Sequence, residues 1–114
     1  MRTTSKEKFS PAVSYRTDLL DRIRRSPNQG LAYLQAAWED GYDVFLVALK
    51  DVVDARGGIS RLARQTGLHR VSLHGALSKA GNPRLANLSK ILDALGIRLT
   101  VARKGAPKRR KKAG

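Results

Sequence analysis

The chain has 114 residues and a net charge of +14, from 23 Lys or Arg and nine Asp or Glu, which suits one domain with tails. It contains no Cys, which excludes disulfides and thiolate metal sites. No apolar run reaches the roughly 18 residues of a membrane span, and the N-terminal stretch lacks the apolar core of a secretory signal, so we expect a soluble, cytoplasmic protein with no membrane partner.

The positive charge is confined to the C-terminal half. Residues 1–55 contain eight basic and eight acidic residues, residues 56–102 contain eight basic residues and one acid, and residues 103–114 contain seven basic residues and no acid. This asymmetry indicates a polyanionic partner and a salt-sensitive affinity. A solvated charged face is the alternative, but a candidate DNA-binding motif starts at the same point, which favours double-stranded DNA.

The spacing of apolar residues predicts an all-α fold of five to six helices. Residues 1–14 show no sustained period and are expected to form a flexible N-terminus. The N-terminal helices are expected over residues 15–42. One starts near Tyr15, and a second follows the cap and first-turn pair Ser26-Pro27. Apolar residues recur in this second helix at spacings of three and four: Leu31, Leu34, Ala37 and Trp38.

A helix-turn-helix DNA-binding domain is expected over residues 43–102. Its first helix has Asp43 as a candidate cap. Two short helices then follow between Ile59 and Leu77, the first of them capped by Ser60.

The turn between these two short helices carries the motif. Gly67 is placed at the corner, where a left-handed backbone is needed. The small Ala63, four residues earlier, lets the helices cross closely, as a helix-turn-helix requires. An ordinary helical hairpin is the alternative.

The last helix follows the turn Gly81-Asn82-Pro83. Its apolar residues are expected to face the core: Leu85, Leu88, Ile91, Leu92 and Leu95. The alternation of Ile97, Leu99 and Val101 with polar residues then predicts a short C-terminal strand. Because the strand has no evident mate in the chain, pairing across a two-fold axis would give a homodimer, and an extended segment on the last helix is the alternative. Residues 103–114 form a basic tail that is too charged to fold alone and is expected to be disordered.

The second helix of the motif is the expected recognition element. With Leu73 on its buried face, the opposite face would enter the major groove. Arg70 can bond guanine in a bidentate manner, Val71 can touch a thymine methyl, and Gly75 lets the backbone approach closely. Further contacts with base edges and phosphates are assigned to Ser60, Arg61, Arg64, His69, Ser72, His74, Ser78, Lys79, Asn82, Arg84, Asn87 and Lys90. Plain surface exposure is the alternative for each.

Catalytic patterns are missing from the sequence. It has no nucleophile beside a base, no Gly-rich phosphate loop with Lys and no cluster of metal ligands. His69 and His74 diverge around the helix and cannot share a metal without a third ligand. We therefore expect neither an enzyme nor a cofactor or metal site.

In combination, these patterns resemble the probable addiction-module antidote proteins, which are HigA-like antitoxins with a Cro/phage-repressor type (lambda-repressor-like) helix-turn-helix. The resemblance covers about residues 14–99. It is carried by Tyr15, Leu19 and Leu20, by AYLQAAWEDG at 32–41, by FLVALKDVVDARG at 45–57, and by the motif and last helix at 60–99.

The resemblance implies the antitoxin of a type II toxin-antitoxin module. Such a protein binds operator DNA as an autorepressor and neutralises a small, basic RelE/ParE-like toxin by direct binding. Opposite charge would then make the acidic residues a toxin-binding surface: Glu39, Asp40, Asp43, Asp51 and Asp54. The simpler interpretation is that these acids cap helices and solubilise the neutral half. A stand-alone transcriptional regulator and a general nucleoid or RNA-binding protein are the alternative functions.

Overall fold

Six helices and no strand form the fold in the computed structural model, which describes residues 11–78 and 81–105. The helices are α1 (Pro11–Arg25), α2 (Pro27–Asp40), α3 (Tyr42–Ala55), α4 (Gly58–Thr66), α5 (Arg70–Ala76) and α6 (Leu85–Ala94). The expectation of an all-α fold is therefore confirmed. None of these helices has both the length and the apolar character needed to cross a bilayer.

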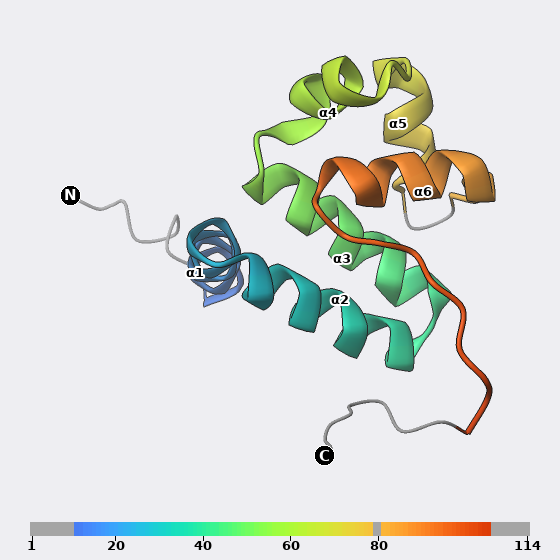
Figure 1. Cartoon of the computed structure of the whole chain (residues 1–114). Helices are drawn as coiled ribbons and strands as arrows, with labels where there is room; N and C mark the ends of the chain where they lie inside the picture. Colours follow the sequence, from blue (N-terminus) through green and yellow to red (C-terminus); the bar gives the residue numbers. More distant parts are fainter. Residues whose placement is uncertain (1–10, 79–80, 106–114) are drawn as a thin grey trace.

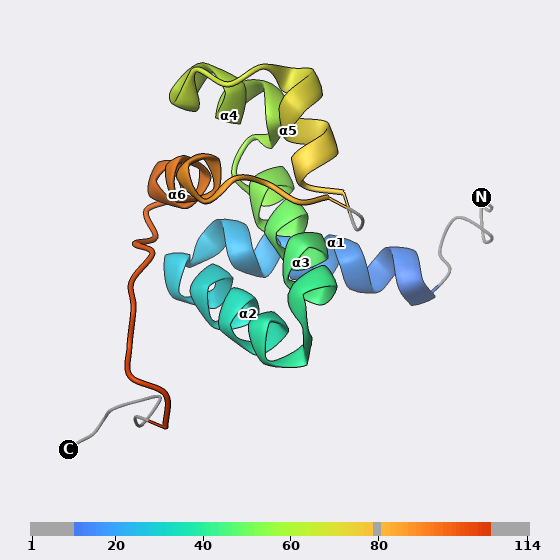
Figure 2. The same ribbon diagram turned by 90° about the vertical axis from the view of Figure 1, so that its right-hand side faces the viewer.

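Helix α3 connects the two parts of the molecule. It packs against α1 and α2 on one side and against α4 on the other, and α4 in turn packs against α5 and α6. Figure 1 and Figure 2 show the result from two directions: α4 and α5 lie at one end of the molecule, and the connection from α2 to α3 lies at the opposite end.

One hydrophobic core joins residues of all six helices. Its most deeply buried side chains are Ile23, Leu46, Leu49, Val52, Val53, Leu73 and Ile91. Burying one such side chain contributes about 1.5–3 kcal/mol. Because Leu73 of α5 and Ile91 of α6 belong to the same cluster as α3, the core fixes the orientation of α5.

Glycines take the capping positions that the sequence assigned to polar residues. Gly41 (φ 137°) precedes α3, so Asp43 is not the cap but lies in the first turn, where its carboxylate still suits the positive end of the helix. Gly57 (φ 112°) precedes α4, which places Ser60 inside its first turn. The prediction that Ser26 and Pro27 start α2 is confirmed, whereas the first helix begins at Pro11 and not near Tyr15.

The predicted C-terminal strand is wrong for the described residues. The Ile97 N–H bonds to the Leu92 carbonyl at 2.9 Å, and Ile97 packs against the core. Beyond it, Leu99 and Val101 are exposed, and residues 97–103 form no ladder. Alternation alone does not make a strand, since a strand also needs a neighbouring segment to pair with.

Three residues of the apolar patterns are at the surface, and one of them, Leu85, was expected to face the core. Leu34 and Ala37 of α2 are buried, but Leu31 and Trp38 are exposed, and so is Leu85 at the start of α6. The helical period gives the angular position of a side chain, but it does not say whether a neighbouring element covers it.

Candidate nucleic-acid interface

The turn between α4 and α5 has the geometry that the sequence predicts. Gly67 adopts φ 79°, in the left-handed region, and its N–H bonds to the Ala63 carbonyl at 2.9 Å. The Thr66 hydroxyl donates to the Leu62 carbonyl and accepts from the Leu68 N–H, at 2.8 and 3.2 Å. These bonds satisfy the Leu62 and Ala63 carbonyls and the Leu68 N–H at the end of α4, and residues 67–69 connect α4 to α5.

Helix α5 presents one face to the core and the other to solvent. Leu73 is 1% exposed and Val71 is 83% exposed. The polar residues of α5 that were predicted to contact DNA are also exposed: Arg70, Ser72 and His74. The exposed Val71 side chain is thus accessible to the methyl group of a thymine.

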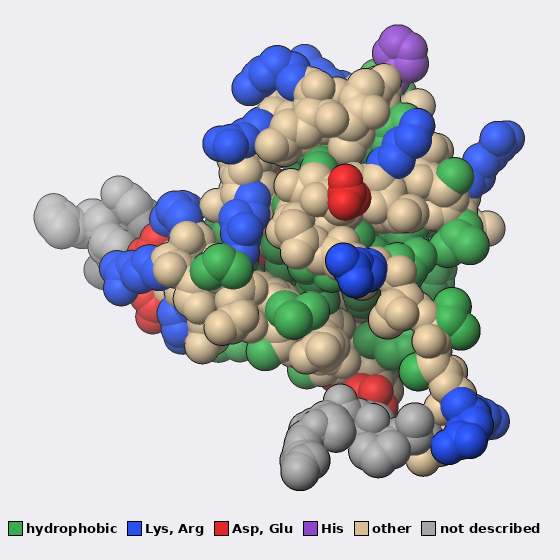
Figure 3. Space-filling model, in the orientation of Figure 1, with side chains coloured by type: hydrophobic (Ala, Val, Ile, Leu, Met, Phe, Trp, Pro, Cys, Tyr) green, Lys and Arg blue, Asp and Glu red, His purple; other side chains and the backbone are tan. Residues whose placement is uncertain are grey.

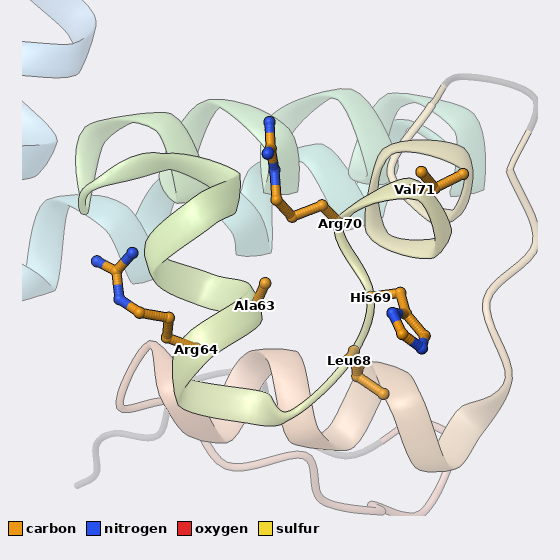
Figure 4. A pocket seen from close by; sticks show the side chains of 6 residues that line it. All are labelled: Ala63, Arg64, Leu68, His69, Arg70 and Val71. Carbon is orange, nitrogen blue, oxygen red and sulfur yellow. The ribbon is translucent and has the colours of Figure 1, made fainter.

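The α4–α5 turn and the start of α5 line an open hollow of about 420 Å³. Its lining residues are Ala63, Arg64, Leu68, His69, Arg70 and Val71. Figure 4 shows Arg64 on α4 and Arg70 at the start of α5, with the small side chain of Ala63 between the two helices. The lining thus includes two arginines, which favours an anionic ligand such as a phosphate-sugar strand.

Most of the remaining predicted contact residues are exposed. Those exposed in the structure are Ser60, Arg61, Gly75, Ser78, Asn82, Arg84 and Lys90. Asn87 is half-buried, and Lys79 lies outside the described residues. The Ser78 hydroxyl donates to the Gly75 carbonyl at 2.9 Å, and Asn82 accepts a 3.4 Å hydrogen bond from the Tyr42 hydroxyl. The structure thus ties the segment after α5 to the start of α3.

Lys, Arg and His side chains are seen over the end formed by α4 and α5 (Figure 3). This distribution matches the sequence, in which the excess of basic residues begins at Arg56. Together with the exposed face of α5, it gives a positive surface that fits a polyanion. The described residues contain no group of three or more His, Cys, Asp and Glu side chains able to hold a metal ion.

The five acids that were assigned to toxin binding do not form one surface. Glu39, Asp40 and Asp43 are exposed at the α2–α3 connection. Asp51 is buried, so it is not part of an exposed patch, and Asp54 is half-buried.

The sequence analysis missed the partners of Asp51. Its carboxylate bonds to Arg16 of α1 and accepts a 2.6 Å hydrogen bond from the Tyr33 hydroxyl of α2. Arg16 also pairs with Asp54 at 2.8 Å. One signal for this was present: Asp51 stands three residues after Ala48 and four before Ala55, both buried, so helical spacing places it on the inward face of α3.

Burial and hydrogen bonding affect the protonation of this group. Burial, together with the hydrogen bond to Asp51, raises the pKa of Tyr33 above its ordinary value of 10.0. The hydrogen bond to Asp51 raises the pKa of Arg16, and burial opposes it only in part. Through these bonds the side chain of Asp51 joins α1 and α2 to α3.

Comparison with known proteins identifies the family of the chain. One relative, an uncharacterized protein of Haemophilus influenzae, is 40% identical over 63 residues, which are 55% of this chain and 64% of that protein. No solved structure matches the chain. A family model described as "Probable addiction module antidote protein" matches residues 17–103. That match spans α2 to α6 and most of α1, and the chain therefore belongs to the family of probable addiction module antidote proteins.

Proposed function

We propose that this protein is the antitoxin of a type II toxin-antitoxin module. It binds a RelE/ParE-like toxin directly and so neutralises it, and it represses its own operon by binding operator DNA. It acts by binding alone, without a catalytic step or a cofactor, in the cytoplasm. Membership of the antidote family supports the neutralising role, and the surface of α5 supports the operator-binding role.

In this proposal, α4, the Gly67 turn and α5 act as a helix-turn-helix. The observation that carries it is the exposure of Val71, Ser72 and His74 on a helix that Leu73 anchors in the core. The N-terminal end of α5 enters the major groove first. Arg70, at that end, donates two hydrogen bonds to a guanine edge.

Basic side chains and backbone N–H groups around α5 bind the DNA phosphates. The start of α4 offers backbone N–H groups and the positive end of the helix, beside Arg61. Arg64 borders the hollow from the α4 side, and Arg84 stands at the start of α6. Two copies, bound as a homodimer to half-sites about 34 Å apart, would read a palindromic operator.

Operator binding is tested with the DNA upstream of the protein's own gene. Fluorescence anisotropy against this fragment and against a scrambled one should give a specificity ratio of at least about 10³. Arg70→Ala should weaken operator binding about 5- to 150-fold, since a bidentate base contact supplies about 1–3 kcal/mol. Arg24→Ala, which removes the same charge from α1, is the matched control and should change affinity far less. A ratio near one would instead indicate a general nucleic-acid-binding protein.

Toxin neutralisation is tested with the product of the adjacent gene. Expressed alone, that product should arrest growth, and co-expression of this protein should relieve the arrest and give a complex that co-purifies. Specific operator binding without any such complex would indicate the alternative, a stand-alone transcriptional regulator.

A further inference from the structure

The exposed aromatic residues at the α2–α3 connection form a surface of their own. Trp38 is 58% exposed near the end of α2, and Tyr42 is 43% exposed at the start of α3. Gly41, with φ 137°, makes the corner between them. We call Trp38, Tyr42 and the three acids around them, Glu39, Asp40 and Asp43, the aromatic corner.

The Trp38 ring is held in place although it is exposed. It contacts the ring of Phe45 edge-to-face, with centroids 5.2 Å apart and planes at 89°, and Phe45 is itself buried. An aromatic side chain that is already ordered loses little conformational entropy when a partner covers it. Trp and Tyr are also the residue types most enriched among the hot spots of protein interfaces.

The charge of this region is opposite to that of the rest of the chain. Residues 26–49 contain no Lys or Arg, and their only charged residues are the three acids of the aromatic corner, in a chain of net charge +14. All three are exposed. Carboxylates repel phosphate, so the three acids of the aromatic corner do not suit a contact with DNA. Helices α4 and α5 lie at the other end of the molecule (Figure 1), and the Tyr42 hydroxyl bonds to one predicted DNA-contact residue, Asn82. A second copy docking corner to corner would place like charges face to face.

We propose that the aromatic corner is the docking site for a basic protein partner, which places an Arg or Lys side chain over the exposed face of Trp38. A guanidinium over an indole ring is attracted by the ring electrons, and the three carboxylates steer a basic partner to this place. The inference rests on the proposed function, and it names the surface through which the toxin is bound.

The test measures affinity for the adjacent gene product by calorimetry, with the full chain and four variants. Trp38→Ala should weaken binding at least about 30-fold, which corresponds to a hot spot of about 2 kcal/mol. Tyr15→Ala is the matched control, because Tyr15 is an equally exposed aromatic residue on α1, and it should change affinity less than about threefold. Asp40→Lys should weaken binding, and Asp93→Lys, the same charge change on α6, should not.

Each variant is also titrated with operator DNA, because an unchanged operator affinity shows that the fold is intact. If the wild-type chain binds the gene product and Trp38→Ala and Asp40→Lys bind it as tightly, the docking proposal is overturned while the antitoxin role stands. If the wild-type chain does not bind it, both are overturned.

Discussion

The Tyr33 hydroxyl donates a 2.6 Å hydrogen bond to the carboxylate of Asp51, whose side chain is 8% exposed. Arg16 supplies the charge that opposes this buried carboxylate. Burying a charge is costly unless it is both paired and hydrogen-bonded, and here the partners come from two other helices. One residue of α3 thus fastens α1 and α2, although none of these side chains lies on the candidate DNA surface.

Asp51→Ala should lower the free energy of unfolding by about 2–3 kcal/mol, because it leaves the part-buried Tyr33 hydroxyl without its acceptor and leaves Arg16 with Asp54 alone. Urea denaturation followed by circular dichroism measures the change. Asp21→Ala is the control, since Asp21 pairs with Arg24 on the exposed side of α1 and a surface pair contributes at most about 1 kcal/mol. Equal losses in the two variants would contradict the structural role of Asp51.

Alkaline pH should destabilise the protein through Tyr33. Its pKa is raised in the folded state above the ordinary value of 10.0, so between these two values the unfolded chain has lost a proton that the folded chain keeps. The stabilisation of the folded state by protonated Tyr33 is therefore fully present below about pH 10, and it is lost as the pH rises beyond this value. Tyr33→Phe should flatten this part of the pH dependence of unfolding, and Tyr42→Phe, at an exposed tyrosine, should leave it unchanged.

Gly75→Ala should change the stability of the protein and its affinity for DNA in opposite directions. A Cβ at Gly75 would meet no atom within 4 Å, so replacing a helical Gly by Ala should raise the free energy of unfolding by about 0.5–1 kcal/mol. The same methyl group would stand between α5 and the floor of the groove, so operator affinity should fall. Thermal melts and anisotropy measure the two effects. A variant that is more stable and binds DNA as before would show that Gly75 does not face the duplex.

Removing residues 103–114 should weaken specific and random DNA binding by the same factor. The segment carries seven Lys or Arg, and contacts with phosphate carry no sequence information. The slope of log K against log salt should decrease in size by about 0.9 for each phosphate contact that is lost. A tail of the same composition in scrambled order should restore both values, whereas a change in the specificity ratio would show that the tail reads bases.

The local features of the fold were predictable from sequence. The corner at Gly67 depends on a backbone conformation that Gly adopts cheaply, and the burial of Leu73 follows from the spacing of its own short helix. Both are properties of a few consecutive residues. The family resemblance rested on the same stretches and is confirmed at the level of the antidote family.

Features that depend on distant residues were not predictable in this way. Asp51 and Arg16 are 35 positions apart in the sequence, and no local sequence pattern predicts their contact. Trp38 has the right spacing for the core, but it is exposed and contacts the buried ring of Phe45. Val101 fits a strand pattern, yet the described residues give it no mate. In each case the outcome depends on which element packs next to the residue.

The hydrogen bond from Tyr42 to Asn82 connects the aromatic corner with the segment that leads away from α5. A protein bound at the aromatic corner would therefore affect Asn82, a residue that was predicted to contact DNA. Thermodynamic reciprocity then applies: whatever factor such a protein imposes on the affinity for DNA, DNA must impose on the affinity for that protein. The strength of gene repression would in this way depend on how much of the partner protein the cell contains.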